Sequence, residues 1–253
     1  MPEGLFSGQG PVFAADRDGS GNPINYAWMG NVSDANIGLS TDTLTHKESY
    51  TGNRTTDARI ITELTATASF TSDDFKESNF VMASYGVAAA ISGGAVTGEA
   101  VLTDPPVIGE RYALKATGRV SAVTLKDNGV AITNTKYSID ASGVIVFSDV
   151  TGMTGPITAD YTNAASRQVG VFKTAPPEKH IRVDGYNTAR TVSGDFGRVV
   201  AEAFKTRLDP LETLGLINDE FGTMVINGSV LVDTTKAQAS ATGQFMRLIY
   251  FDA

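Results

Sequence analysis

Apolar and polar side chains alternate along the segment "RIITELTATASF", which covers residues 59–70. A β-strand has a side-chain period of two, so such alternation separates a chain into a dry face and a wet face. The segment therefore predicts a strand with one dry face. The expected dry face comprises Ile60, Leu64, Ala66, Ala68 and Phe70, and the expected wet face comprises Arg59, Glu63, Thr65, Thr67 and Ser69.

Three segments in the last third of the chain also predict strands. They cover residues 197–208, 221–233 and 243–251, and each carries apolar residues on both faces. Strands of this kind must be covered on both sides. In a mainly antiparallel protein we expect the core on one face and, on the other, a helix, an inserted module or a neighbouring subunit. The polar segment of residues 30–57 predicts short strands joined by a long loop.

Only one segment combines helical periodicity with capping signals. Ser72 or Asp74 can cap the N-terminus, Glu77 follows Asp74 by three residues, and Gly86 is a stop signal. We expect a single helix over residues 74–85. The fold class predicted is mainly β: an antiparallel β-sandwich or barrel with one flanking α-helix.

A glycine-rich hinge at residues 91–99 leads into a stretch with its own turn signals. Hairpin-type turns are predicted at Asp127-Asn128-Gly129 and at Ala141-Ser142-Gly143. We therefore expect a small all-β module inserted at residues 95–164. The main domain would then be discontinuous, with residues 1–94 and 165–253, and with residues 1–24 as an extended N-terminal arm.

The segment "DRDGSGNPINYAWMGNV", residues 16–32, begins like a calcium loop. Asp16, Asp18 and Ser20 have the spacing of the first half of an EF-hand. The second half does not match, because Ala27 stands where the bidentate carboxylate belongs and no helical pattern flanks the loop. We predict a turn before a strand, no metal site, and leave open a weak cation at Asp16 and Asp18.

Composition excludes several classes of protein. The chain has 253 residues, no cysteine and a formal charge of −8, with 5 basic and 11 acidic residues in residues 1–94. This balance opposes nonspecific adhesion to nucleic acid. The longest apolar run, at residues 87–91, is far below the roughly 20 residues that cross a bilayer, so no membrane insertion is expected.

No catalytic motif is present, and we predict neither an enzyme nor a cofactor. His180 alternates with Arg182 and Asp184 opposite Ile181 and Val183, which predicts the wet face of a strand. His46 beside Glu48 is interpreted as part of a solvated polar loop. Tyr26 and Trp28 could form a sugar-stacking platform, although packing in a core or an interface is favoured.

The order of these features resembles the major tail tube proteins of long-tailed, siphovirus-like bacteriophages. In that family an arm rich in Gly, Asn and Pro leads to a strand ending in Gly-Asn-Val, a polar loop, an alternating strand and one helix. The matching positions are Gly30-Asn31-Val32, Lys47-Glu48-Ser49 and Gly52-Asn53-Arg54, followed by the helix. The segments "AVTGEAVL", "YSIDASGVIVF" and "ITADYT" resemble the Ig-like or hairpin module that such proteins often carry.

The resemblance implies a structural virion protein, made in the host cytoplasm, whose hexameric rings stack into a hollow tail tube. Phage DNA would pass through the lumen without specific binding. The implied partners are other copies of the chain, the tail terminator, the tape measure and the baseplate or tip proteins. Alternatives are the inner tube of a contractile tail or injection system, and a carbohydrate-binding adhesin or fibre module that uses Tyr26, Trp28 and Tyr50.

We expect the arm and the loop of residues 41–57 to reach the next ring, and the long strands to close the ring between neighbours. The inserted module is expected outside the bore. The candidate contact residues are Phe6, Phe13, Thr43, His46, Lys47, Glu48, Tyr50, Asn53, Arg54, Phe245, Leu248, Tyr250 and Phe251.

Overall fold

A computed structural model describes residues 5–192, 195–239 and 241–251. The protein is mainly β, with 54% of residues in strands and 4% helical, and its strands pair antiparallel. The predicted fold class is confirmed. The chain divides into two compact units, Met1–Val87 with Val171–Ala253, and Ala88–Gly170. The second unit contains the predicted module at residues 95–164 and is longer at both ends.

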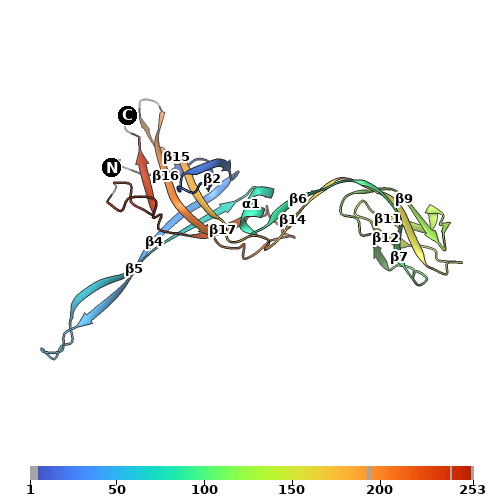
Figure 1. Ribbon diagram of the computed structural model, residues 1–253, viewed down its shortest axis with the longest axis horizontal. Helices are drawn as coiled ribbons and strands as arrows, with labels where there is room; N and C mark the ends of the chain where they lie inside the picture. Colours follow the sequence, from blue (N-terminus) through green and yellow to red (C-terminus); the bar gives the residue numbers. More distant parts are fainter. Residues whose placement is uncertain (1–4, 193–194, 240, 252–253) are drawn as a thin grey trace. The chain divides into compact units, whose positions relative to one another are not determined.

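The first unit is built on one nine-stranded sheet (Figure 1). Its order is β3-β2-β15-β16-β17-β5-β4, with β1 paired to β15 and β18 paired to β16. The strands are β1 (Gly8–Gln9), β2 (Val12–Arg17), β3 (Pro23–Trp28), β4 (Val32–Lys47), β5 (Thr56–Ser72), β15 (Glu178–Val192), β16 (Asp195–Leu208), β17 (Met224–Val230) and β18 (Met246–Tyr250).

The core of this unit gathers side chains from strands far apart in the sequence. Val12, Phe70, Ile181, Leu208 and Ile226 are all fully or almost fully buried in one cluster. Such burial is the main favourable term in folding. Through this cluster, side chains of β5 share one core with side chains of β2 and β15.

The helix α1 (Glu77–Ala83) is shorter than the predicted 74–85. The predicted capping by Ser72 or Asp74 is wrong. The carboxylate of Asp74 instead accepts a hydrogen bond from the Asn31 backbone N–H at 2.9 Å, and no side chain caps the helix. The helix adds Met82 and Ala83 to the core, which explains why so short a helix is stable.

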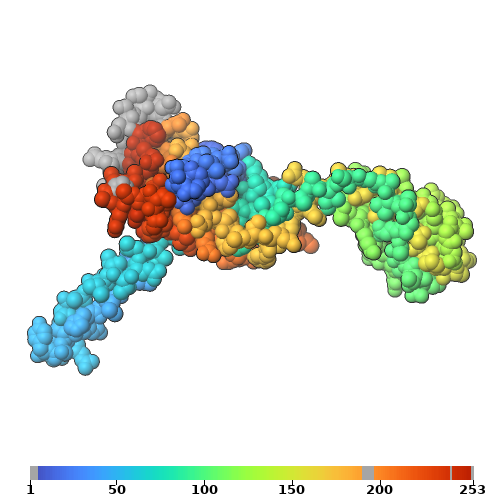
Figure 2. Space-filling view, in the orientation of Figure 1, coloured from blue at the N-terminus to red at the C-terminus, as the bar shows by residue number. Residues whose placement is uncertain are grey.

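The prediction of a long loop over residues 41–57 is also wrong. Residues 32–47 form one 16-residue strand, β4, paired with β5 along its whole length, and only residues 48–55 form a loop. Polar residues extend as a strand here because β5 supplies their backbone hydrogen-bond partners. Figure 2 shows the distal part of this hairpin, in light blue, extending beyond the packed body of its unit.

The expectation of an extended arm over residues 1–24 is wrong for the strands β1 and β2, and residues 1–4 lie outside the described residues. β1 and β2 pair with β15, and Val12 and Ala15 are buried. The glycine-rich residues 18–22 form the turn between β2 and β3, in which Asp18 N–H donates to Asn22 O at 2.9 Å. The prediction of a turn before a strand is therefore confirmed. The continuous apolar run of residues 12–15 and its pairing with β15 place this segment inside the sheet.

The second face of β16 is covered by a loop of the same unit. Val200, Glu202 and Phe204 are buried on this face. The described part of the loop of residues 231–245 (all but residue 240) lies against it: Phe204 N–H donates to Phe245 O at 3.0 Å, and the Lys236 ammonium lies 4.8 Å from the Phe204 ring centre. The expected two-sided cover is present, but the covering element is this loop.

The second unit has its own core. A four-stranded sheet has the order β10-β9-β13-β7, a three-stranded sheet has the order β11-β12-β8, and β6 pairs with β14. The core includes Leu125, Ile145, Phe147 and Ile157. The elements are β6 (Val87–Ile91), β7 (Gly94–Leu102), β8 (Arg111–Ala113), β9 (Val120–Asp127), β10 (Val130–Ala131), η1 (Asn134–Lys136), β11 (Tyr137–Ile139), β12 (Val144–Phe147), β13 (Ile157–Asn163) and β14 (Ser166–Gly170).

Both predicted turns of this unit are confirmed. Asn128 and Gly129 link β9 to β10 with φ of 49° and 82°, the left-handed values that a two-residue hairpin turn requires. The Asp140 carboxylate accepts the backbone N–H groups of Ser142 and Val144, both at 2.9 Å, and so closes the turn between β11 and β12.

Candidate interaction surfaces

The candidate residues Glu48, Tyr50, Asn53 and Arg54 lie together in the loop of residues 48–55, here called the tip loop. Thr43, His46 and Lys47 precede it on β4. The buried Glu48 carboxylate accepts hydrogen bonds from the backbone N–H groups of Tyr50 (3.0 Å) and Thr51 (2.9 Å) and from two threonine hydroxyls. These bonds, led by the one from the Thr51 side chain, lower the pKa of Glu48 to about 2. The tip loop is thus ordered around one inward-facing carboxylate.

The cations of the tip loop and the strand ends beside it point to solvent. Lys47, Arg54 and Arg59 are exposed, while the Asp57 carboxylate is held 2.6 Å from the His46 Nδ1 atom. With Glu48 turned inward and Asp57 paired, the outer surface of this end of the hairpin is positive.

One face of the hairpin is apolar beyond the point where the core ends. The pairs Ile37↔Ala68, Leu39↔Ala66 and Thr41↔Leu64 share the face of Phe70. Leu39 is 72% exposed and Leu64 is 60% exposed, so the expected dry face of β5 is dry only from Ala66 onward. A bulge between Glu63 and Ile61 places Ile61 on this face and Ile60 on the other, which corrects the predicted position of Ile60.

Over residues 36–42 and 63–69 the opposite face of the same strands is polar. Register places the pairs Asn36↔Ser69, Gly38↔Thr67, Ser40↔Thr65 and Asp42↔Glu63 on it, and β17 adds Asn227 and Ser229. Ser69 donates to the Asn227 side chain at 2.8 Å. Within residues 36–42, 63–69 and 225–229, all of which are described, this face carries two carboxylates and no lysine or arginine.

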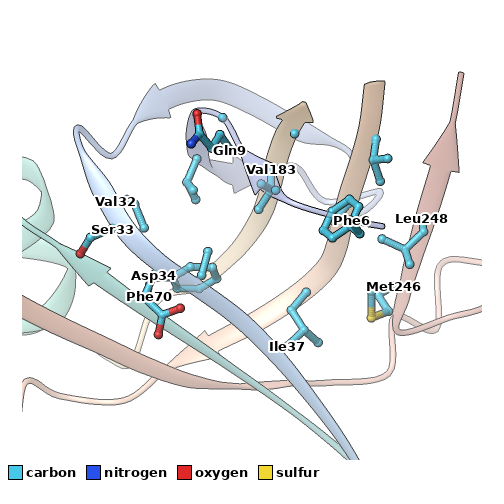
Figure 3. Close-up of a pocket in the computed structure, with 17 residues that line it drawn as sticks. Phe6, Gln9, Val32, Ser33, Asp34, Ile37, Phe70, Val183, Met246 and Leu248 are labelled. Carbon is cyan, nitrogen blue, oxygen red and sulfur yellow. The ribbon is translucent and has the colours of Figure 1, made fainter. Parts of the chain in front are cut away.

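Two further candidates, Phe6 and Leu248, meet in a groove of about 460 Å³ (Figure 3). Ile37 and Phe70 from the hairpin form one wall, and Val183 belongs to the other. The remaining candidates lie near this region without lining it. Phe13 is partly buried on β2, Phe245 packs against the core, Tyr250 ends β18, and Phe251 follows it.

A second exposed apolar surface lies in the loop of residues 209–223, here called the root loop, between β16 and β17. Leu216, Ile217 and Phe221 are 82%, 96% and 99% exposed. The loop encloses a hollow of about 630 Å³ whose lining includes Glu212, Asp219 and Glu220. The sequence prediction included none of these apolar residues as contact candidates. Three large apolar side chains in a turn-rich segment could have indicated a contact surface here.

His180 was predicted on a wet face, and this prediction is wrong. The side chain is 3% exposed, because the ring of Tyr26 and the ring of Phe204 lie against it, with ring centres at 5.9 and 6.1 Å. Neither ring nitrogen has a hydrogen-bond partner among the described residues. Burial lowers the pKa of His180 despite the Glu202 carboxylate 4.0 Å away.

Glu202 is the buried anion of this cluster. Arg182 Nη1 at 2.9 Å and Arg247 Nε at 2.5 Å donate to its two oxygens. Burial alone would raise its pKa, but the hydrogen bond and charge of Arg247 outweigh burial and lower it. Because both oxygens are held by arginines, the cluster is a structural ion-pair network rather than a base free to react.

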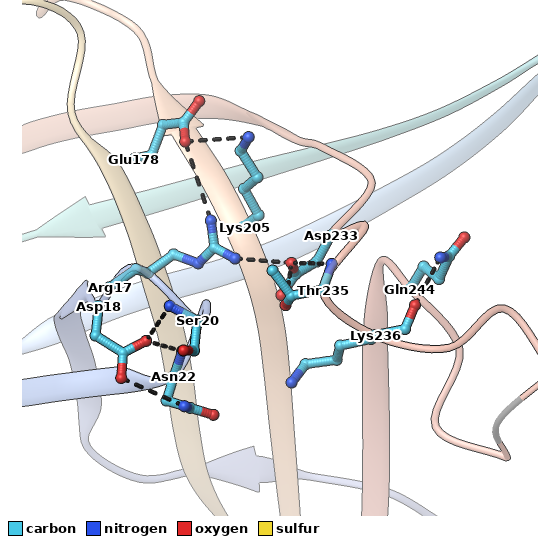
Figure 4. A network of polar contacts seen from close by, with 10 residues as sticks. All are labelled: Arg17, Asp18, Ser20, Asn22, Glu178, Lys205, Asp233, Thr235, Lys236 and Gln244. Carbon is cyan, nitrogen blue, oxygen red and sulfur yellow. Dashed lines mark hydrogen bonds and ion pairs between the residues drawn. The ribbon is translucent and has the colours of Figure 1, made fainter.

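Asp16 and Asp18 are both engaged within the protein. Asp16 contacts the Lys179 ammonium, and Asp18 accepts the backbone N–H groups of Ser20 (2.9 Å) and Asn22 (2.8 Å). Nearby, Arg17 Nη2 lies 2.8 Å from the buried Asp233 carboxylate (Figure 4). This ion pair ties the loop of residues 231–245 to β2.

The three aromatic residues of the adhesin alternative do not form one platform. Tyr26 and Trp28 share β3, where Lys76 lies 3.7 Å from the Trp28 ring centre, whereas Tyr50 belongs to the tip loop. Among the described residues, no group of three or more His, Asp or Glu side chains could hold a metal ion. In the same part of the chain, no helix has the length and apolar character needed to span a bilayer.

Fold and surfaces together define an antiparallel β protein with a projecting hairpin, exposed apolar surfaces on the hairpin and the root loop, and a second β unit inserted into the first. Residues 5–249 match the family described as "Protein of unknown function UCP028589", and the chain belongs to this family. No curated protein matches the sequence.

Proposed function

We propose that this protein is a structural virion protein that assembles into stacked hexameric rings and forms the tail tube through which phage DNA is ejected. The ring number, the virion location and the partners (tail terminator, tape measure and baseplate or tip proteins) rest on the resemblance to major tail tube proteins. The observation that carries the proposal is the apolar face of the hairpin, Leu39, Ile61 and Leu64, all of which are exposed.

Self-assembly would cover this face. Large apolar surface left in water is unfavourable, at roughly 25 cal/mol per Å², and a contiguous patch of it marks an interaction site. In the described sheet, β4 is an edge strand, so its outer backbone N–H and C=O groups have no partner strand. Open edges of this kind pair readily with another chain. A second copy that packs on this hairpin and pairs with β4 would cover the apolar face and also supply the missing backbone hydrogen-bond partners.

The polar face of the hairpin suits the bore of a tube. Hydroxyls, amides and the two carboxylates Asp42 and Glu63 present no cation that could hold a phosphate. Protein affinity for DNA comes largely from lysine and arginine on phosphates. A lumen lined by this face would therefore let DNA slide past without retaining it.

Electron microscopy of negatively stained protein over a concentration series, with mass photometry on the same samples, tests the proposal. We expect hollow rings or tubes. The double variant Leu39→Ser/Leu64→Ser should remain folded, because both side chains are exposed, and should lose assembly. The matched control is Ser40→Ala/Thr65→Ala, a neighbouring cross-strand pair on the polar face, which should assemble like the unmodified chain.

A protein that stays monomeric at every concentration, also when mixed with a tail-initiation complex, would overturn the proposal. A glycan array would then test the adhesin alternative. If both double variants form tubes equally well, the proposed tube function stands, but the apolar hairpin face is not the contact that builds the tube.

A further inference from the structure

The tip loop and the root loop lie at opposite ends of the hairpin. Lys47 pairs with Thr56 beside the tip loop, whereas Met224, the residue that follows the root loop, pairs with Ser72 at the other end of β5. Leu211 N–H donates to Ala83 O at 2.7 Å and fixes the root loop beside α1. A copy placed in line with another along the hairpin axis therefore brings a tip loop to a root loop.

Both ends expose apolar side chains. The root loop presents Leu216, Ile217 and Phe221, the last of them 99% exposed. The tip end presents Tyr50, Leu44 and Ile60, all exposed. Aromatic and aliphatic side chains of this kind are the usual anchors at the centre of a protein interface.

The charges of the two ends are opposite. Residues 209–223 contain four carboxylates and no lysine or arginine. The tip end exposes Lys47, Arg54 and Arg59, while its two carboxylates are occupied, Glu48 by the tip loop itself and Asp57 by His46. The hollow of the root loop has Glu212, Asp219 and Glu220 in its lining, so a cationic side chain entering it would meet only carboxylates as charged groups.

We propose that the root loop of one copy receives the tip loop of the next copy, with Arg54 and Lys47 against the carboxylates of the root loop and Tyr50 against its apolar side chains. The contact is heterologous, because two different surfaces meet, and with successive copies placed in line along the hairpin axis it propagates as an open stack. This inference rests on the proposed function. It adds the surface that receives the hairpin, and it gives the assembly a direction, with the tip end of each ring on the root end of the next.

A charge-swap experiment tests the contact. Reversal at the tip (Lys47→Glu/Arg54→Glu) places like charges opposite each other and should raise the protein concentration needed for tubes by at least about tenfold. Reversal at the root loop (Asp219→Lys/Glu220→Lys) should do the same. The chain that carries both reversals should recover assembly to within about threefold of the unmodified chain, because opposite charges face each other again.

Two controls keep the result interpretable. The reversal Lys115→Glu/Arg119→Glu changes the net charge by the same amount as the tip reversal. It lies at exposed residues of the other unit and should leave assembly unchanged. Phe221→Ser probes the apolar part of the contact and should weaken assembly with no change in melting temperature, since the side chain is almost fully exposed. Circular dichroism of each variant confirms that it is folded.

The outcomes separate the two proposals. An unmodified chain that never assembles, even with a tail-initiation complex, overturns both the proposed function and this contact. Unmodified tubes with tip-reversed or root-reversed variants that assemble normally overturn the contact alone. Loss of assembly in each single reversal without recovery in the combined chain also overturns it, because both surfaces would then be needed for contacts with something other than each other.

Discussion

Single side chains decide which parts of the first unit respond to pH. His180 is enclosed by aromatic rings and has no partner for either ring nitrogen among the described residues. Burial lowers its pKa below the ordinary 6.5. In the unfolded chain the imidazole takes up a proton near pH 6.5, whereas in the folded chain it does so only at lower pH. The stability that depends on neutral His180 is therefore complete above pH 6.5 and is lost as the pH falls below that value.

We expect the melting temperature to fall by at least about 3 °C between about pH 7.5 and about pH 5, and His180→Phe to flatten this dependence. Phenylalanine fits among the rings and takes up no proton. Thermal melting followed by circular dichroism at both pH values measures the effect. An equal fall in melting temperature in both proteins would mean that titratable groups other than His180 cause the pH dependence. The charged and titratable groups around His180 are Glu202, Arg182, Arg247, Lys236, Arg17 and Tyr26.

At the scale of elements, the loop of residues 231–245 is essential because it covers a strand face that would otherwise be wet. It is held by the ion pair between Arg17 and Asp233, of which Asp233 is fully buried. Burial raises the pKa of Asp233, but hydrogen bonds from Thr235 and Arg17 outweigh burial and keep the pKa below its usual value. The element is thus attached to β2 through one charged contact.

Arg17→Met should destabilise the protein by about 3–5 kcal/mol, because it leaves a buried carboxylate without its cation. Urea unfolding measures this loss, and hydrogen exchange should show faster exchange in residues 231–245. The double variant Arg17→Met/Asp233→Leu is the control and should recover much of the stability. A single variant as stable as the unmodified chain would contradict this role of the ion pair.

At the scale of the molecule, two units with separate cores share one chain. The chain leaves and re-enters the first unit at neighbouring points, since Phe172 N–H donates to Ser84 O at 3.0 Å and Lys173 N–H donates to Tyr85 O at 2.7 Å. The second unit is therefore inserted without separating the strands of the first.

Replacement of residues 88–170 by a short glycine-serine turn should leave the first unit folded and able to assemble. Far-ultraviolet circular dichroism and melting would show a cooperative β protein, and electron microscopy would show thinner or smoother tubes. The isolated segment of residues 88–170 should also fold. An insoluble first unit would mean that its stability depends on the second.

Sequence alone was sufficient for the features that depend on neighbouring residues. Alternation predicted the strand character of β5, apolar residues on both faces predicted that of β16, and the Asn-Gly pair predicted the turn at Asn128. The limits of the helix were missed because Asp74 binds Asn31, more than forty residues away, instead of capping. Strand pairing with β15 turned an expected arm into β1 and β2, and pairing with β5 turned an expected loop into β4.

Burial was decided by the tertiary structure, because periodicity assigns a side chain to a face but does not say whether anything covers that face. Leu64 and Phe70 have the same place in the pattern of β5, yet Phe70 lies in the core and Leu64 lies beyond its end. His180 follows a wet-face pattern and is buried by Tyr26 and Phe204. The sequence by itself determined a mainly β chain with an inserted β unit. Only the folded arrangement of distant strands decided which apolar residues remain uncovered, and these residues carry the proposed assembly.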